Sequence, residues 1–354
     1  MTSAANRSVP SAKEEAITTP RRRRRAVTIR DVANSASVST ATVSKFVNGG
    51  QKFSREVEDR IGRAIRELGY SSNPMARGMI TGMTGNVGII ILDIRNPHFT
   101  SMVKGASRVA TDAGLNLIFA DAAESRAPEL GVVQSLCRRV DGLIVSARLP
   151  KPVIDTLIAA DTPVVFYGGP SPHPACHSVC CDNYLSAFIL GKHLRELGHR
   201  RVSYLGFSGA LWSAERWRGL QDALEGSGAT LTLHDAASPS TEEGERLASS
   251  VLLGAQSPDA VVAFNDLLAL GLLAEARILG IKVPEQVSVA GFDNVRYGQY
   301  AYPGLTSVDM MSETIGELAM RRLMAVIAGT DEPIGFKDDV LQPRLIVRES
   351  TSAK

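Results

Sequence analysis

From Asn86 onward, short runs of Val, Ile and Leu alternate with longer segments in which apolar residues recur at helical spacing. This rhythm is typical of an open parallel α/β sheet with helices on both faces. The segment is long for one such sheet, so we expect two lobes. The predicted strands are 87–92, 115–120, 142–146, 164–167, 202–206, 260–264 and 287–291. The predicted helices lie near 102–113, 130–139, 185–197, 216–225, 267–279 and 313–327.

Residues 27–70 predict three short helices in place of this alternation. Thr28 followed by Asp31 fits the capping box that begins a helix. Ser39 is a candidate N-cap for a second helix, 40–48, and Gly69 would end a third helix that starts after Ser54. The residues expected to form the small core of this head are Val32, Ala33, Ala36, Val57, Ile61, Ile65 and Leu68.

The second helix of the head has two different faces. Val43, Phe46 and Val47 would point toward the other two helices. The opposite face holds small and polar side chains, which would allow the helix to enter a major groove of DNA. Its residues are Thr40, Ala41, Thr42, Ser44, Lys45 and Asn48. The pattern alone fits equally well an ordinary three-helix bundle with a polar outer face.

Charge is unevenly distributed along the chain. Residues 1–80 hold 15 Lys and Arg against 7 Asp and Glu, a net charge of +8, whereas the remainder carries −6. Residues 1–26 lack apolar periodicity and predict a disordered arm, in which Arg21 to Arg25 would attract phosphates in a salt-sensitive manner. Residues 71–85 predict a linker, within which 74–80 could form a short helix. A basic head on an acidic body indicates that the head contacts a polyanion.

Several function classes find no support in the sequence. There is no apolar run long enough to span a membrane and no apolar stretch of a secretory signal near Met1, so we expect a cytoplasmic protein. Neither a phosphate-binding glycine loop nor a nucleophile elbow is found, which argues against an enzyme. A sugar-binding component of a transporter is a further alternative, but the basic head argues against it. His173, Cys176, His177, Cys180 and Cys181 match no standard zinc spacing, and we expect no metal or other cofactor.

Ordered motifs over most of the chain resemble the lactose-repressor/galactose-repressor family of transcriptional regulators. They begin with Val27-Thr28-Ile29-Arg30-Asp31-Val32-Ala33 and Val38-Ser39-x-x-Thr42-Val43-Ser44-Lys45-x-x-Asn48-Gly49, and continue through Leu68-Gly69-Tyr70-x-x-Asn73-x-x-Ala76-Arg77. In the body they are Asn96-Pro97-x-Phe99, Arg139-Val140-Asp141-Gly142, Leu197-Gly198-His199-Arg200-Arg201, Asn265-Asp266, Gly291-Phe292-Asp293 and Leu345-x-x-Arg348-Glu349-Ser350.

The resemblance implies a helix-turn-helix head, a hinge and a two-lobed body like that of periplasmic binding proteins. The domains we expect are the arm at 1–26, which lies outside the resemblance, the head at 27–70, the hinge and linker at 71–85, and the effector-binding and dimerisation domain at 86–354. Two heads of a homodimer would read a near-palindromic operator, with the hinge residues Asn73, Arg77 and Met79 at the minor groove. Because no heptad repeat follows Ser350, dimers are expected rather than tetramers.

Two residues of the head depart from the family pattern. Lys45 stands where an arginine is usual, and lysine lacks the bidentate fork that reads guanine. Ser37 stands where a turn glycine is usual, and if that position needs a positive φ, serine would cost about 1 kcal/mol there.

The resemblance also implies an effector site between the lobes. Its residues would be Phe99, Arg216, Asn265 and Asp293, with Asp93 and His98 nearby. The family often has a polar ligand group where this chain reads Tyr167-Gly168-Gly169, so either the pocket is larger or Tyr167 compensates. We therefore expect a repressor of carbohydrate uptake or catabolic genes that a sugar controls. An activator that responds to another metabolite is the alternative.

Overall fold

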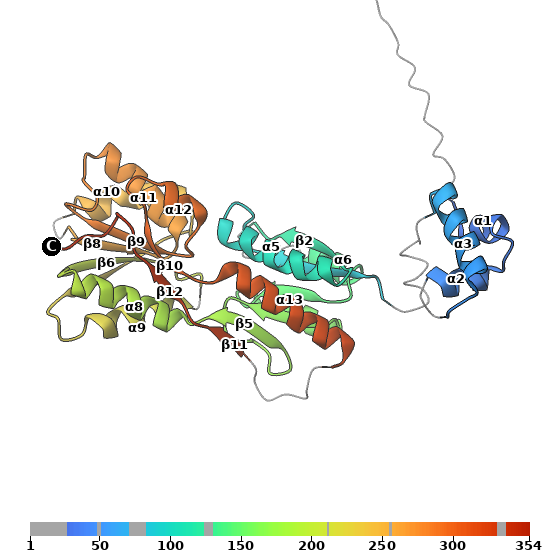
Figure 1. Cartoon of the computed structure of the whole chain (residues 1–354). Helices are drawn as coiled ribbons and strands as arrows, with labels where there is room; N and C mark the ends of the chain where they lie inside the picture. The colour runs from blue at the N-terminus through green and yellow to red at the C-terminus, as the bar shows by residue number, and fades with distance from the viewer. Residues whose placement is uncertain are drawn as a thin grey trace, which may run out of the picture. The chain divides into compact units, whose positions relative to one another are not determined.

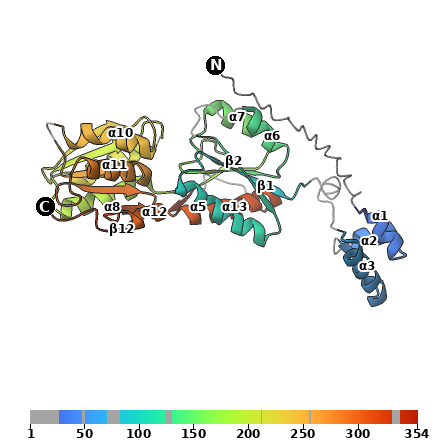
Figure 2. The ribbon, with the colours of Figure 1, turned by 90° about the horizontal axis from the view of Figure 1, so that it is seen from above.

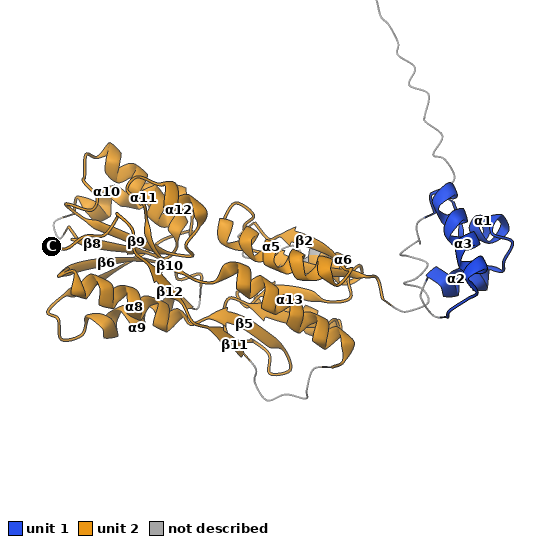
Figure 3. Cartoon of the chain, viewed as in Figure 1, with its two compact units in different colours: residues 1–77 blue, residues 78–354 orange. Residues whose placement is uncertain are grey.

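The computed structural model describes residues 27–47, 51–70, 83–123, 130–210, 212–254, 257–330 and 338–354. The chain divides into two compact units, residues 1–77 and 78–354 (Figure 3). Among the described residues, no helix combines the length and the apolar composition needed to cross a membrane. The predicted arm, and the predicted hinge helix at 74–80, lie outside the described residues.

The described part of the first unit contains three helices, α1 (Ile29–Ser35), α2 (Thr40–Val47) and α3 (Arg55–Leu68). Local hydrogen bonds begin and end them as the sequence predicts. The Asp31 carboxylate accepts hydrogen bonds of 2.7 Å from the backbone N and the hydroxyl of Thr28. The Ser39 hydroxyl accepts one of 3.1 Å from the backbone N of Thr42, and Gly69 ends α3 with a φ of 64°.

The core of this unit is small and lies between the three helices. Val43 is fully buried in it, and Phe46 packs against it. Val47 is 36% exposed, so the prediction that it points into the core is wrong. It is the last residue of α2, and it is not among the apolar side chains that pack against the core. The buried core residues are Val32, Ala33, Ala36, Val43, Ile61 and Ala64.

The second unit is built on two six-stranded sheets, one in each lobe. The first sheet has the order β11-β5-β4-β3-β1-β2 and the second β12-β10-β9-β8-β6-β7. The strands of the first are β1 (Asn86–Ile91), β2 (Asn116–Asp121), β3 (Leu143–Ser146), β4 (Val164–Tyr167), β5 (His177–Cys181) and β11 (Asp338–Leu341). Those of the second are β6 (Arg201–Gly206), β7 (Thr230–Asp235), β8 (Ala260–Ala263), β9 (Ser288–Phe292), β10 (Thr306–Asp309) and β12 (Arg344–Ile346).

Helices pack in pairs on both faces of each sheet (Figures 1 and 2). In the first lobe, α5 (Pro97–Asp112) pairs with α13 (Ser312–Ala328), and α6 (Leu130–Cys137) pairs with α7 (Lys151–Ala159). In the second lobe, α8 (Asn183–Glu196) pairs with α9 (Trp212–Leu224), and α10 (Thr241–Leu252) pairs with α11 (Asp266–Ile278). A short helix, α12 (Arg296–Tyr300), follows β9.

The chain passes between the lobes three times: from β5 into α8, from β10 into α13, and from β11 into β12. Because the parallel strands of each lobe deliver their carboxyl ends toward these passages, the loops that follow the strands meet between the lobes. Ligands of open α/β sheets bind at such strand ends.

All seven predicted strands of the body are present, within one or two residues of their predicted bounds. The sequence analysis missed β5, β7, β10, β11 and β12, and the helices α7, α10 and α12. It also expected parallel pairing throughout, whereas β12 pairs antiparallel with β10.

Candidate DNA-binding face and effector cleft

The outer face of α2 is accessible, as a DNA-reading helix requires. Thr40, Ala41 and Lys45 are exposed, and Thr42 and Ser44 are half-buried. The Lys45 amino group donates a hydrogen bond of 3.2 Å to the Gln51 side chain, which keeps its charge at the end of the helix. Four further predicted DNA contacts, Asn48, Asn73, Arg77 and Met79, lie outside the described residues.

The turn between α1 and α2 has a backbone conformation that favours glycine, although it holds a serine. Ser37 has a φ of 52°, in the left-handed region that favours glycine. The turn closes with a hydrogen bond of 3.0 Å from the Val38 N to the Ala33 carbonyl. This position therefore needs a positive φ, the condition under which a serine was expected to be costly. The Ser37 side chain is tolerated because it is exposed.

A cleft with about 590 Å³ of empty space, part of it open to solvent, lies between the lobes. Aromatic and apolar side chains from both lobes line much of it, as they do in small-molecule sites. Five of the six predicted effector residues line it: His98, Phe99, Arg216, Asn265 and Asp293. Its other lining residues are Asn96, Arg148, Tyr167, Gly168, Cys181, Asn183, Trp212, Pro239, Phe264, Met310 and Ile315.

Arg216 is fixed in the interior of the second lobe. It is 4% exposed, and its guanidinium lies 4.8 Å from the ring centre of Phe264 and 4.3 Å from that of Phe292. Its Nε donates a hydrogen bond of 3.0 Å to Asn183 Oδ1, and its Nη1 donates to the Phe264 carbonyl. These contacts hold the guanidinium in place before any ligand binds.

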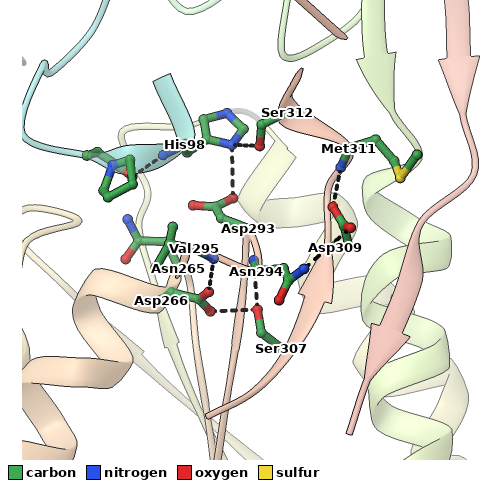
Figure 4. A network of polar contacts seen from close by, with 12 residues as sticks. His98, Asn265, Asp266, Asp293, Asn294, Val295, Ser307, Asp309, Met311 and Ser312 are labelled. Atoms are coloured by element: carbon green, nitrogen blue, oxygen red, sulfur yellow. Dashed lines mark hydrogen bonds and ion pairs between the residues drawn. The ribbon is translucent and has the colours of Figure 1, made fainter. Parts of the chain in front are cut away.

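His98 and Asp293 meet across the boundary between the lobes (Figure 4). His98 lies in α5 of the first lobe, and Asp293 follows β9 of the second; their Nδ1 and Oδ1 atoms are 3.4 Å apart. The Ser312 hydroxyl lies 2.8 Å from the same His98 nitrogen. Burial raises the pKa of Asp293, although His98 and Arg216 oppose that shift.

The buried carboxylate of Asp266 binds the loop that carries Asp293 (Figure 4). Asp266 accepts hydrogen bonds of 2.8 Å from the Val295 N and 2.7 Å from the Ser307 hydroxyl. Burial raises the pKa of Asp266 well above its ordinary value, and the neighbouring Asp293 adds to the shift. With these bonds the loop keeps Asp293 and Asn294 at φ values of 103° and 50°.

Asn265 and Phe99 line the cleft but serve the fold as well. Asn265 caps α11, accepting from the Leu268 N at 2.9 Å, and its amide donates to the Pro239 carbonyl at 2.9 Å. Phe99 is 7% exposed, with its ring edge-on to His98 and tilted against Tyr167.

Asp93 does not line the cleft with the other predicted effector residues. Its carboxylate instead accepts hydrogen bonds from the backbone N of Arg95 at 2.9 Å and from the Arg95 side chain at 3.1 and 3.0 Å. An Asp that closes a strand commonly engages the following turn in this way.

The sequence analysis expected either a larger pocket at Gly168 and Gly169 or a compensating polar group from Tyr167. The pocket is not enlarged there. A Cβ atom at either glycine would lie 3.4 Å from the indole ring of Trp212, which comes from the second lobe. Tyr167 does not supply a free polar group either, since its buried hydroxyl donates a hydrogen bond of 3.1 Å to the Ile90 carbonyl.

Sequence reasoning missed several lining residues, among them Arg148, Asn183 and Trp212. Asn183 begins α8 directly after β5, and an asparagine at that junction was the available signal. Cys181, which the sequence analysis considered only as a possible zinc ligand, also lines the cleft. No group of three or more His, Cys, Asp and Glu within the described ranges could hold a metal ion.

Comparison with known proteins places the chain in a family. Residues 28–73 match the model of bacterial regulatory proteins of the lacI family, and residues 192–351 match a periplasmic binding protein-like domain. The repressor CytR of Escherichia coli K12 is 30% identical over 336 residues, which cover 93% of this chain and 97% of CytR. The chain belongs to the lacI family of bacterial regulatory proteins.

Further relatives agree with this assignment. The regulator GalR of Escherichia coli K12 is 30% identical over 330 residues, covering 92% of this chain and 96% of GalR. The complex of the regulator CelR with cellobiose superimposes with a TM-score of 0.67 at 28% identity, over 92% of this chain and 99% of CelR. The lac repressor dimer bound to operator and an anti-inducer has a TM-score of 0.82 at 22% identity, over 93% and 100% of the two chains. The predicted fold class, a helix-turn-helix head with a two-lobed body, is confirmed.

Proposed function

We propose that this lacI-family regulator is a cytoplasmic homodimeric repressor whose operator binding is controlled by a sugar or sugar derivative in the cleft between its lobes. The observation that carries the proposal is the pairing, in one chain, of an accessible α2 face with a cleft whose polar groups come from both lobes. A ligand that contacts both lobes favours one arrangement of the lobes over another, and this differential affinity is what couples effector to operator.

Two kinds of support stand behind this proposal. CytR is named a repressor, and CelR was solved with cellobiose. In the cleft itself, Arg216, Asn265 and Asp293 offer donors and acceptors suited to hydroxyl groups, and Phe99 offers an apolar face. The effector roles of these residues, and the operator roles of Thr40, Ala41, Thr42, Ser44 and Lys45, form part of the proposal.

Operator binding tests the first half. Genomic footprinting with the full-length protein should find an inverted repeat. Lys45→Ala should weaken binding to that site by about 1–3 kcal/mol if it reads a base, or lower the salt dependence by about one ion if it contacts phosphate. Arg66→Gln, an exposed charge in the last turn of α3, is the matched control and should bind as the parent does. Absence of any preferred inverted repeat would refute the proposal.

Effector control tests the second half. Thermal-shift screening against sugars, sugar phosphates and nucleosides should identify a ligand that raises the melting temperature, because binding to the folded state alone stabilises it. The same ligand should change operator affinity. A reporter gene at the footprinted site should gain expression when the regulator gene is deleted; a loss of expression would instead indicate an activator.

A further inference from the structure

The imidazole of His98 has a polar partner in each lobe (Figure 4). The Ser312 hydroxyl, on α13 of the first lobe, lies 2.8 Å from its Nδ1 atom. The Asp293 carboxylate, on the loop after β9 of the second lobe, lies 3.4 Å from the same nitrogen. Because a ring nitrogen has either one proton or one lone pair, it can engage only one of these partners at full strength. His98 therefore favours either a contact within its own lobe or a contact across the cleft.

The protonation state of the His98 ring decides which partner is favoured. In the neutral tautomer with its proton on Nε2, Nδ1 accepts a hydrogen bond from the Ser312 hydroxyl and presents a lone pair to the Asp293 carboxylate. When the ring is charged, both nitrogens carry protons and Nδ1 can only donate. A positively charged donor binds a carboxylate more strongly than it binds a hydroxyl. Proton uptake by the ring therefore strengthens the contact between the lobes.

The contact between His98 and Asp293 is shielded from solvent. Their side chains are 16% and 8% exposed, and the Phe99 ring lies edge-on to the imidazole. Charges attract each other more strongly in such a site than in bulk water. Both side chains also line the cleft, so the strength of their contact affects how the lobes meet around a ligand.

In the first lobe, the amino ends of α5 and α13 oppose a positive charge on the His98 ring. His98 is in the first turn of α5, and Ser312 is the first residue of α13. The amino end of a helix carries about half a unit of positive charge. Glu313, in the same turn of α13, pairs instead with two basic side chains of α5. The Asp293 carboxylate bears a full charge when ionised and lies 3.4 Å away, so it is the group that favours proton uptake.

In the second lobe, charged groups of both signs surround the Asp293 carboxylate. Arg216 of α9 lowers its pKa, and Asp309 of β10 raises it. Asp266, at the start of α11, is fully buried, and burial raises its own pKa well above the ordinary value. Arg348 donates a hydrogen bond of 2.7 Å to the side chain of the residue after Asp293. All these groups belong to the second lobe, so they do not by themselves join Asp293 to the first.

The ion pair between His98 and Asp293 exists over a limited pH range. Histidine side chains ordinarily change their charge between about pH 5 and 8. Burial raises the pKa of Asp293, and below that pKa the carboxyl group takes up a proton and loses its attraction for the imidazole. The ion pair is therefore absent at alkaline pH, forms as the pH falls through the neutral range, and is lost again in acid.

We propose that His98 forms a pH-dependent contact between the lobes, in which Asp293 replaces Ser312 as its partner when the imidazole takes up a proton. Proton uptake favours the arrangement in which the two lobes meet around the cleft, and proton loss weakens it. The effector and the proton then act on one equilibrium, so each changes the apparent affinity for the other. That coupling rests on the proposed function, whereas the pH-dependent contact does not.

Tryptophan emission of the full-length protein, without any ligand, measures the contact. The Trp212 ring comes from the second lobe and lies against Gly168 and Gly169 of the first, so parting of the lobes hydrates it. Lowering the pH from about 8.5 to about 6 should shift the emission to shorter wavelength, because the histidine gains its charge in this range. The same titration of Trp212→Phe should show no shift.

Variants separate this contact from general effects of pH. His98→Gln has no charge to gain and Asp293→Asn has none to attract the imidazole, so each should lose the shift. Ser312→Ala removes the partner within the first lobe and should move the midpoint of the change to higher pH. The matched control is His234→Gln, since His234 lies 3.3 Å from the Ser203 hydroxyl on the edge strand β7. It should keep the shift of the parent.

A full pH response in His98→Gln or in Asp293→Asn would overturn the proposal, and so would a parent whose emission does not change with pH. Operator footprinting separates this inference from the proposed function. A protein that binds a specific operator but shows no pH-dependent emission refutes the lobe contact alone. A protein whose emission depends on His98 but which has no preferred DNA site refutes the regulator function and leaves the contact standing.

Discussion

Ser37 occupies a backbone conformation that its side chain disfavours. At a φ of 52° the Cβ atom of an L-residue crowds the following carbonyl, at a cost of about 1–2 kcal/mol. The turn needs that conformation because α1 and α2 are joined by only four residues, Ala36 to Ser39. The strain therefore lies directly between the helix that begins the head and the helix proposed to read DNA.

Replacing Ser37 with glycine should stabilise the head by about 1 kcal/mol, because glycine adopts this φ without a Cβ clash and loses only part of the gain to chain entropy. Hydrogen exchange of the α1 and α2 amides in the full-length protein measures it. Ser35→Gly, the same change within α1, should instead destabilise the head. Faster exchange in Ser37→Gly would contradict the assignment of strain.

Asp293 combines two unfavourable features at one position. It has a φ of 103°, and its side chain is only 8% exposed. Burial raises its pKa, and the nearby Asp309 adds to the shift, whereas His98 and Arg216 oppose it. A carboxyl group with a raised folded pKa lowers stability at pH values above that pKa. This cost disappears as the pH falls toward the unfolded value of 3.8.

Asp293→Asn should therefore be more stable than the parent at neutral pH, and the difference should shrink as the pH is lowered toward 4. It should also lose the response to effector. Denaturant unfolding across this pH range measures the first effect. The control is Asp155→Asn, whose side chain is 59% exposed, and it should show no such trend. A parent more stable than Asp293→Asn at pH 7 would show that the contact with His98 outweighs burial.

The ends of helices could be predicted from the sequence, because they depend on hydrogen bonds and backbone angles of residues that are close in the chain. The Ser39 cap, the Asp31 capping box and the Gly69 helix end are of this kind. His98 and Asp293 were found only through the family resemblance, since nothing local brings together residues 195 positions apart. Arg148 and Trp212 were missed because their contacts come from the opposite lobe.

At the scale of elements, α5 and α13 carry the first-lobe side of the site. They contribute His98 and Ser312, and they approach closely because glycines stand at their contact. A Cβ atom at Gly105 would lie 2.0 Å from the Glu313 carbonyl oxygen, and one at Gly316 would lie 2.0 Å from the Met102 carbonyl oxygen. The position of His98 relative to Asp293 therefore depends on this helix spacing.

Gly105→Ala should destabilise the body by about 1–3 kcal/mol, because the helix backbones must separate to admit the methyl group. It should also weaken effector binding by moving His98. Chemical denaturation and calorimetric titration of the full-length protein measure the two effects. Gly131→Ala in α6, where a Cβ atom would meet nothing within 4 Å, should leave both unchanged or raise stability slightly.

Strands that are buried could be predicted from the sequence more easily than strands that are exposed. Strands β1, β3, β4 and β8 are buried over nearly their whole length, so they are continuous apolar runs that stand out. Strand β7, of sequence Thr-Leu-Thr-Leu-His-Asp, is mostly exposed at a sheet edge and has one neighbour. Strand β12 has only three residues, and its antiparallel pairing with β10 depends on the third passage between the lobes.

At the scale of the whole second unit, contacts between described residues join the lobes around the cleft. His98 meets Asp293, Arg148 stacks over Phe207, and Trp212 lies against Gly168 and Gly169. The sequence predicted two lobes from length and from the alternation of strands and helices. It could not give the three passages of the chain between them, because β11 and β12 belong to different sheets although they are nearly adjacent in sequence.

Trp212 offers a direct measure of how the lobes are arranged. The chain has two tryptophans, and the other, Trp217, stacks on Tyr204 within the second lobe. A leucine at Gly169 would extend from a Cβ position already 3.4 Å from the Trp212 ring, so it should push the ring off the first lobe. Gly169 is the better position for this wedge, because Gly168 has a φ of 86° that would add backbone strain.

Gly169→Leu should therefore shift tryptophan emission to longer wavelength, as the Trp212 ring becomes hydrated, and should weaken effector binding. The same change in a Trp212→Phe background should leave emission unmoved, which assigns the signal to Trp212 rather than Trp217. Operator affinity of Gly169→Leu then shows which arrangement of the lobes binds DNA. If that variant binds operator like the parent and responds to effector normally, contact between Trp212 and the first lobe plays no part in the switch.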